Sequence, residues 1–123
     1  MRSISIKHCL ELAEKFINTR GTIPDYYKKE REKCGWTVWG GNPDDADYMQ
    51  AGKPVREQKD ATGHAVRAVY LYTGMADLAS ETGDSTLYEA CKTLWDSITK
   101  RRMYITGGIG SPNLGEAFSV DYD

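Results

Sequence analysis

The feature that most constrains the fold is a pair of apolar helical stripes separated by a turn of only a few residues. Over residues 60–82, small and apolar side chains recur at the three-and-four spacing of a helix, and residues 86–101 repeat that pattern. Gly83 suits the end of the first helix, and Asp84 or Ser85 can cap the second. Helices joined so tightly pack antiparallel, so the sequence predicts a helical hairpin over 60–101.

The first helix of this hairpin is apolar around most of its surface. Its main stripe comprises Ala61, His64, Ala65, Ala68, Leu71, Tyr72, Met75, Ala76 and Ala79, and the opposite side carries Val66, Val69, Tyr70 and Leu78. A helix of this kind is usually an inner one, packed against several neighbours. A further amphipathic helix is predicted over 4–19, with Ser3 or Ser5 as its N-cap and Gly21 just past its end.

Two irregular stretches complete the chain. Residues 22–53 are interrupted by glycines and prolines, and their several tyrosines and tryptophans argue against disorder, so they predict an ordered, loop-rich segment. Residues 103–123 begin with a candidate extended piece at 104–106 and continue as a glycine-rich loop. Because no closing helix follows this loop, the chain is expected to be a fragment of a larger single domain.

Composition excludes several classes of protein. The 16 Lys and Arg nearly balance the 18 Asp and Glu, and no basic run could follow a nucleic-acid backbone. No apolar stretch approaches the roughly 20 residues that span a bilayer, and the N-terminus lacks the apolar run of a secretory signal. The sequence therefore predicts a soluble, cytoplasmic protein without nucleic-acid or membrane partners.

The cysteines predict reduced thiols. Cys9, Cys34 and Cys91 are odd in number and match no zinc spacing. His8 and His64 form no local metal pair with them. No metal or other cofactor site is expected from this chain alone.

Two side chains are candidates for chemistry. Glu116 stands on the glycine-lined loop beside Ala117 and Phe118, where partial exclusion of water would raise the pKa of its carboxyl toward that of a general acid. The alternative is an ordinary solvated glutamate. His64 is either a hydrogen-bonded polar group at the start of its helix or a ligand for a substrate hydroxyl.

The glycine-rich segment 107–111 is not a nucleotide loop. No Lys-Ser/Thr follows its glycines, and the spacing matches neither familiar nucleotide fingerprint. Such loops also follow a β-strand, whereas the surroundings here are helical.

Several motifs in order give the chain a family resemblance. From Pro54 onward it resembles the β-L-arabinofuranosidases of glycoside hydrolase family 127. The matching segments are Gln58 with His64-Ala65-Val66-Arg67-Ala68, Tyr70–Ala79, Arg102–Ser111, and Gly115-Glu116-Ala117-Phe118 with Asp121-Tyr122-Asp123. Each motif is weak alone, but their order and spacing together are specific.

The resemblance implies an all-α fold, an (α/α)6 barrel of which this chain would be a part with long irregular loops. It further implies that Glu116 is the general acid/base and that His64 lies in the sugar pocket. Residues 103–123 would then form an active-site loop. The substrate would be a carbohydrate carrying a terminal β-L-arabinofuranosyl residue.

The family also implies a zinc-bound cysteine thiolate as nucleophile in a retaining mechanism. Its zinc ligands belong to motifs that would follow Asp123, and Cys9, Cys34 and Cys91 fall in none of them. At Gly52, two residues before Pro54, the family commonly has a histidine, so any substrate contact from that position is in doubt.

These observations favour a glycosidase fragment that is inactive alone. The alternative is a non-catalytic helical interaction domain derived from such an enzyme, able to form homo-oligomers through apolar surface that a complete barrel would bury. An unrelated helical-repeat protein is less favoured because the sequence contains no internal repeat.

Overall fold

A computed structural model describes residues 5–35, 44–112 and 115–123 of the chain, and this part is helical with no strand. The α-helices are α1 (Ile6–Thr19), α2 (Tyr26–Cys34), α3 (Ala65–Thr82) and α4 (Ser85–Ser97). A 3-10 turn, η1 (Val55–Glu57), precedes α3, and a π-helical turn, η2 (Ile98–Arg102), continues α4. The expectation of an all-α fold is confirmed.

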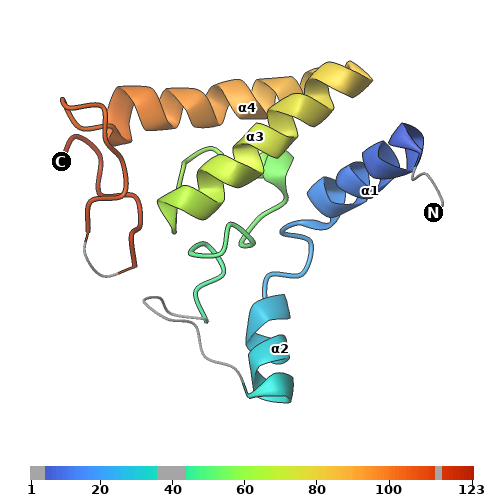
Figure 1. Cartoon of the computed structure of the whole chain (residues 1–123). Coiled ribbons are helices and arrows are strands. Elements are labelled where there is room, and N and C mark those ends of the chain that lie inside the picture. Colours follow the sequence, from blue (N-terminus) through green and yellow to red (C-terminus); the bar gives the residue numbers. More distant parts are fainter. Residues whose placement is uncertain (1–4, 36–43, 113–114) are drawn as a thin grey trace.

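Helices α3 and α4 form a hairpin along the upper side of the molecule in Figure 1 and are its most extensively packed pair of elements. Gly83 ends α3 in the left-handed conformation, at φ 70°, where a side chain would be strained. Asp84 then caps α4, since its carboxylate accepts from the backbone N–H groups of Thr86 and Leu87. Both turn residues therefore act as the sequence predicts.

The hydrophobic core lies between this hairpin, α1 and η1. Its buried members come from all four elements: Ile17, Val55, Met75, Leu78, Ala79, Leu87, Ala90 and Leu94. Three of them, Met75, Leu87 and Leu94, have no exposed surface. The apolar faces that periodicity predicts on the separate helices therefore pack against one another.

Arg56 ties these elements together at the surface of the core. Its guanidinium donates to Asn18 at the end of α1 (2.8 Å), to Thr86 in α4 (2.9 Å) and to Asp84 (2.6 Å). The hydrogen bonds from Thr86 and Arg56 hold the pKa of the Asp84 carboxyl well below its usual range. One arginine thus joins the end of α1 to the start of α4.

The prediction of a loop throughout 22–53 is wrong for residues 26–34, which form α2. This helix buries no residue, so it has no apolar stripe from which periodicity could reveal it. It consists mainly of good helix formers, and Lys29 pairs with Asp25 one turn earlier (2.6 Å). Trp36 and Trp39 lie outside the described residues.

Other boundaries also differ from the sequence expectation. The helix predicted from 60 begins at Ala65, and α4 gives way to the π-helical η2 after Ser97. Residues 104–107 form a tight turn rather than an extended piece: the Gly107 N–H donates to the Tyr104 carbonyl (2.8 Å) and the Tyr104 N–H to that of Gly108 (3.0 Å). Gly107, at φ 84°, makes this reversal possible.

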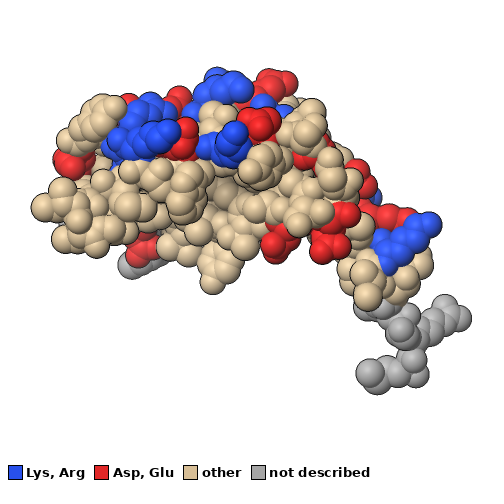
Figure 2. All heavy atoms as spheres, turned by 90° about the horizontal axis from the view of Figure 1, so that it is seen from above, with Lys and Arg blue, Asp and Glu red and all other residues tan. Residues whose placement is uncertain are grey.

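Charged side chains of both signs alternate on one side of the molecule, and a broad area without charge lies beside them (Figure 2). This view shows no uninterrupted basic stripe. Within the described part, none of the helices is long and apolar enough to cross a bilayer.

Candidate active site

The two candidate residues meet because the loop after Gly115 pairs with the chain just before α3. The Ala65 N–H donates to the Glu116 carbonyl and the Phe118 N–H to the Gly63 carbonyl, both at 2.9 Å. These two hydrogen bonds form an antiparallel bridge between His64 and Ala117. Residues far apart in sequence are thereby held as neighbours at the N-terminus of α3.

His64 is the N-cap of α3, and its side chain is only 16% exposed. Its Nδ1 accepts from the Arg67 N–H (3.3 Å), and its Nε2 lies 3.4 Å from Oε2 of Glu116. The ring also meets the Tyr48 ring edge-on, with centroids 5.8 Å apart. Nδ1 therefore acts as an ordinary hydrogen-bonded group at the start of the helix, while Nε2 faces the candidate acid Glu116.

Glu116 stands in a strained backbone conformation. Its φ is 45°, which is uncommon for a residue other than glycine and often marks functional positions. Its side chain is 66% exposed, so the expectation that these residues partly exclude water from it is wrong for the described part. The loop holds the carboxyl outward rather than enclosing it.

A hollow of about 620 Å³ adjoins this carboxyl on the exposed side of α3. Its walls come from α3 and the glycine-rich loop: Ala65, Val66, Val69, Tyr70, Ile109 and Gly110, with Glu116 at the edge. A hollow of this size, lined mainly by apolar side chains and by Glu116, is within the range of pockets that bind small ligands.

The segment around Tyr48 holds both parts of the site in place by hydrogen bonds. The sequence did not predict this role. Tyr48 is buried and its hydroxyl donates to the Gly115 carbonyl (3.0 Å). Gln50, 3% exposed, donates from its amide to the carbonyls of Tyr48, Thr62 and His64. No local pattern marks these residues, because their partners come from distant parts of the chain.

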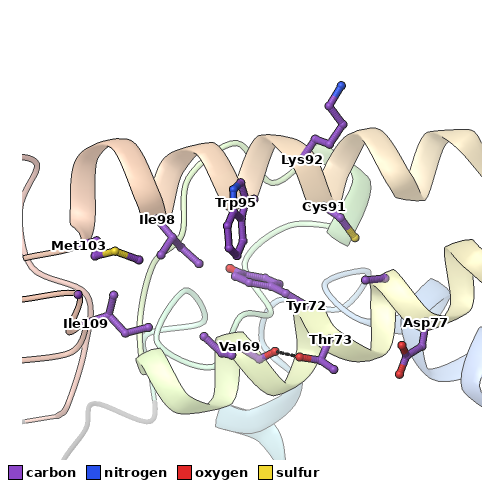
Figure 3. Close-up of a pocket in the computed structure, with 12 residues that line it drawn as sticks. Val69, Tyr72, Thr73, Asp77, Cys91, Lys92, Trp95, Ile98, Met103 and Ile109 are labelled. Atoms are coloured by element: carbon purple, nitrogen blue, oxygen red, sulfur yellow. Dashed lines mark hydrogen bonds between the residues drawn. The ribbon is translucent and has the colours of Figure 1, made fainter.

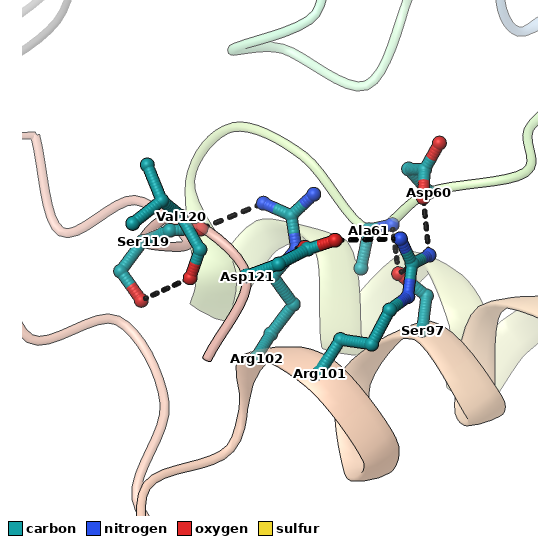
Figure 4. A network of polar contacts seen from close by, with 8 residues as sticks. All are labelled: Asp60, Ala61, Ser97, Arg101, Arg102, Ser119, Val120 and Asp121. Atoms are coloured by element: carbon teal, nitrogen blue, oxygen red, sulfur yellow. Dashed lines mark hydrogen bonds and ion pairs between the residues drawn. The ribbon is translucent and has the colours of Figure 1, made fainter. Parts of the chain in front are cut away.

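The end of the loop is fixed by η2 (Figure 4). Arg101 donates to Asp121 (2.9 Å) and Arg102 forms an ion pair with the same carboxylate (2.6 Å). Arg101 also pairs with Asp60, and the Tyr122 N–H donates to the Arg101 carbonyl (2.7 Å). No local sequence pattern marks these arginines as site residues, but they anchor the segment that carries Glu116.

Zinc does not fit the residues that the structure describes. Among them, no three His, Cys, Asp or Glu side chains come together as a zinc site needs. Cys9, Cys34 and Cys91 are free thiols on three different helices. No step is therefore assigned here to a metal.

Gly110 packs tightly against Ala65 and Glu116, with no room for a side chain. It has φ 75°, and a Cβ added there would lie 2.9 Å from the Ala65 Cβ and 3.3 Å from the Glu116 carbonyl oxygen. Gly110→Ala is expected to lower the free energy of unfolding by about 1–3 kcal/mol, through strain and overpacking, in urea denaturation.

Gly74 provides a matched control with the opposite expected sign. It lies inside α3, and a Cβ there would meet nothing within 4 Å. Gly74→Ala is expected to raise the free energy of unfolding by about 0.5–1 kcal/mol, since alanine is the better helix former. Equal effects of the two substitutions would contradict the tight contact at Gly110.

Comparison with known proteins identifies the family. The family model of the β-L-arabinofuranosidase GH127 catalytic domain matches residues 6–123. The chain is 41% identical over 122 residues to the non-reducing end β-L-arabinofuranosidase of Bifidobacterium longum subsp. longum, covering 95% of this chain and 18% of that protein.

Solved structures agree. A GH127 β-L-arabinofuranosidase from Geobacillus stearothermophilus T6 superposes with a TM-score of 0.84 at 50% identity, covering 96% of this chain and 19% of that one. The GH127 β-arabinofuranosidase BT3674 does so at 0.73 and 43%, covering 96% and 16%. The chain thus spans about a fifth of the length of these relatives. With the motifs, the helical fold and the paired His64 and Glu116 in place, the chain belongs to glycoside hydrolase family 127, as part of its catalytic (α/α) barrel.

Proposed function

We propose that this chain supplies the acid/base side of a β-L-arabinofuranosidase active site. One observation carries the proposal. In this chain, which belongs to the family, Oε2 of Glu116 lies 3.4 Å from Nε2 of His64, and Glu116 lines a pocket. The protonated Glu116 carboxyl donates its proton to the glycosidic oxygen as the aglycone departs and the arabinofuranosyl group passes to the nucleophile. The resulting carboxylate then takes a proton from the attacking water.

The exposure of Glu116 supports this role. A general acid must come within hydrogen-bond distance of the substrate oxygen, and a carboxyl that projects outward from a rigid backbone can do so. His64 lies beside Glu116 and is expected to line the same side of the sugar pocket. The apolar wall from α3 offers a surface for the face of the sugar ring.

The other half of the reaction comes from elsewhere. A retaining glycosidase needs a nucleophile on the opposite side of the sugar from its acid. By resemblance to the family, we expect a zinc-bound thiolate outside this chain to supply it. We therefore expect the chain by itself to be inactive on arabinofuranosides, with or without added zinc. The free cysteines fit a reducing, cytoplasmic location.

A segment replacement tests the proposal. In what we call the chimera, residues 6–123 replace the matching segment of the Geobacillus stearothermophilus enzyme. The chimera is expected to hydrolyse an aryl β-L-arabinofuranoside, whereas the 123-residue chain is not. A folded chimera without activity, or clear turnover by the chain alone, would overturn the proposal.

A second candidate function rests on an apolar groove between α3 and α4 (Figure 3). It has a volume of about 500 Å³ and is lined mainly by Val69, Tyr72, Trp95, Ile98, Met103 and Ile109. Trp95 is 66% exposed, and burial raises the pKa of Tyr72 to about 12. An exposed surface of this kind favours association.

Light scattering distinguishes the two candidates. If the chain is an interaction module, it forms a defined oligomer, and Trp95→Lys in the groove returns it to the monomer. Tyr88→Lys, at another exposed aromatic of α4, serves as the control. A monomer at all accessible concentrations would exclude homo-oligomerisation through this groove.

A further inference from the structure

We propose that His64 is locked in one tautomer, with its Nδ1 capping α3 and its Nε2–H donating to Glu116. This makes His64 a positioning residue for the acid as well as a pocket residue. The catalytic consequence rests on the proposed function, whereas the tautomer itself does not.

The tautomer follows from the two partners of the ring. The Arg67 backbone N–H points to Nδ1 at 3.3 Å, and a donor in that place requires a lone pair. In a neutral imidazole with Nδ1 as acceptor, the proton is on Nε2. Nε2 in turn faces Oε2 of Glu116 at 3.4 Å, and a carboxylate oxygen is an acceptor.

The ring is held in this orientation from several sides. The His64 N–H donates to the Tyr48 carbonyl (3.2 Å), and the His64 carbonyl accepts from Ala68 (3.0 Å) and Gln50 (3.3 Å). The Tyr48 ring stands against the imidazole at an interplanar angle of 73°. The Arg67 guanidinium also lies over the Tyr48 ring, 5.8 Å from its centroid. A flipped ring would lose the cap of α3.

Glu116 depends on this contact. Within the described residues, its carboxyl has no other hydrogen bond or ion pair, although its backbone is fixed at both ends of the bridge. Because Oε2 lies opposite the Nε2–H of His64, we expect the transferable proton on Oε1. The fixed tautomer thereby selects one of the two carboxyl oxygens for chemistry.

The first test reads the tautomer directly in the 123-residue chain. With His8→Gln and no affinity tag, His64 is the only histidine, and a long-range proton–nitrogen NMR spectrum at neutral pH reports which nitrogen carries the proton. The expected result is the Nε2–H form alone, and it persists in Glu116→Ala because the cap remains. The Nδ1–H form, or an even mixture, would overturn the proposal.

The second test separates the two ring nitrogens by substitution in the chimera. Asparagine places an amide oxygen near the position of Nδ1 and is a strong N-cap, but it has no group at Nε2. Glutamine reaches the position of Nε2 with an amide N–H, but it caps poorly. His64→Asn is therefore expected to be the more stable variant, and His64→Gln to have the higher kcat, by about tenfold.

The proposal requires that the two variants rank in opposite order by thermal stability and by kcat. If kcat and thermal stability fall in parallel in both variants, the positioning role is overturned and His64 is only structural. If KM changes and kcat does not, His64 acts on the substrate rather than on Glu116, which also overturns the proposal. An inactive wild-type chimera would contradict the proposed function, while the NMR result would still decide the tautomer.

Discussion

Glu116→Gln is expected to lower the kcat of the chimera on an alkyl or sugar β-L-arabinofuranoside by about 100- to 10,000-fold. The amide is nearly the same size as the carboxyl, and its oxygen can still face the Nε2 of His64, so the loop is expected to keep its conformation. The amide cannot donate and recover the proton that the reaction requires. The substitution therefore removes proton transfer but is expected to keep the conformation of the Glu116 loop.

The leaving group sharpens this experiment. An aryl leaving group of low pKa departs without a proton, so glycosylation of the enzyme should suffer much less in Glu116→Gln with an activated aryl substrate than with an alkyl one. On the alkyl substrate KM should change little, because the proton is transferred in the transition state.

Glu89 provides the matched control. Its side chain on α4 is 66% exposed, the same fraction as Glu116, and its carboxylate pairs with Lys92 (3.5 Å). Glu89→Gln is expected to leave kcat unchanged. A Glu116→Gln variant that retains most of its activity on the alkyl substrate would show that another group is the acid.

Leu94→Ala is expected to lower the free energy of unfolding of the chain by about 2–5 kcal/mol. Leu94 has no exposed surface and packs in the core formed by α1, η1, α3 and α4. Removing its side chain leaves a cavity among groups from separate elements, which cannot all move to fill it. This loss is a large part of the total stability of an ordinary domain, about 5–15 kcal/mol.

Urea denaturation followed by circular dichroism measures the effect. An unchanged slope of the unfolding free energy against urea concentration would show that the two proteins expose the same surface on unfolding. Leu12→Ala is the control: it is the same substitution on α1, where the side chain is 51% exposed, and its effect is expected to stay within about 0.5 kcal/mol. Similar losses in both variants would mean that the core described here does not hold the helices together.

The hairpin was accessible from the sequence because its signals are local. The apolar period, Gly83 and Asp84 are each set by the neighbouring residues, and they direct the same turn in the structure. By contrast, the sequence did not predict α2, because a helix that buries no residue needs no apolar stripe. Periodicity detects burial, and it detects helices only through burial.

Glu116 and His64 were candidates from their motifs, and their roles as acid/base and sugar ligand stay predictions. The sequence by itself determined the helix type of the long segments, the turn between α3 and α4, and the family. Only the tertiary structure decided that the Glu116 loop pairs with the start of α3, that Tyr48 and Gln50 support it, and that Glu116 is exposed. The reason is physical: capping and periodicity act between near neighbours, whereas the site is made by hydrogen bonds between segments that meet only when the chain has folded.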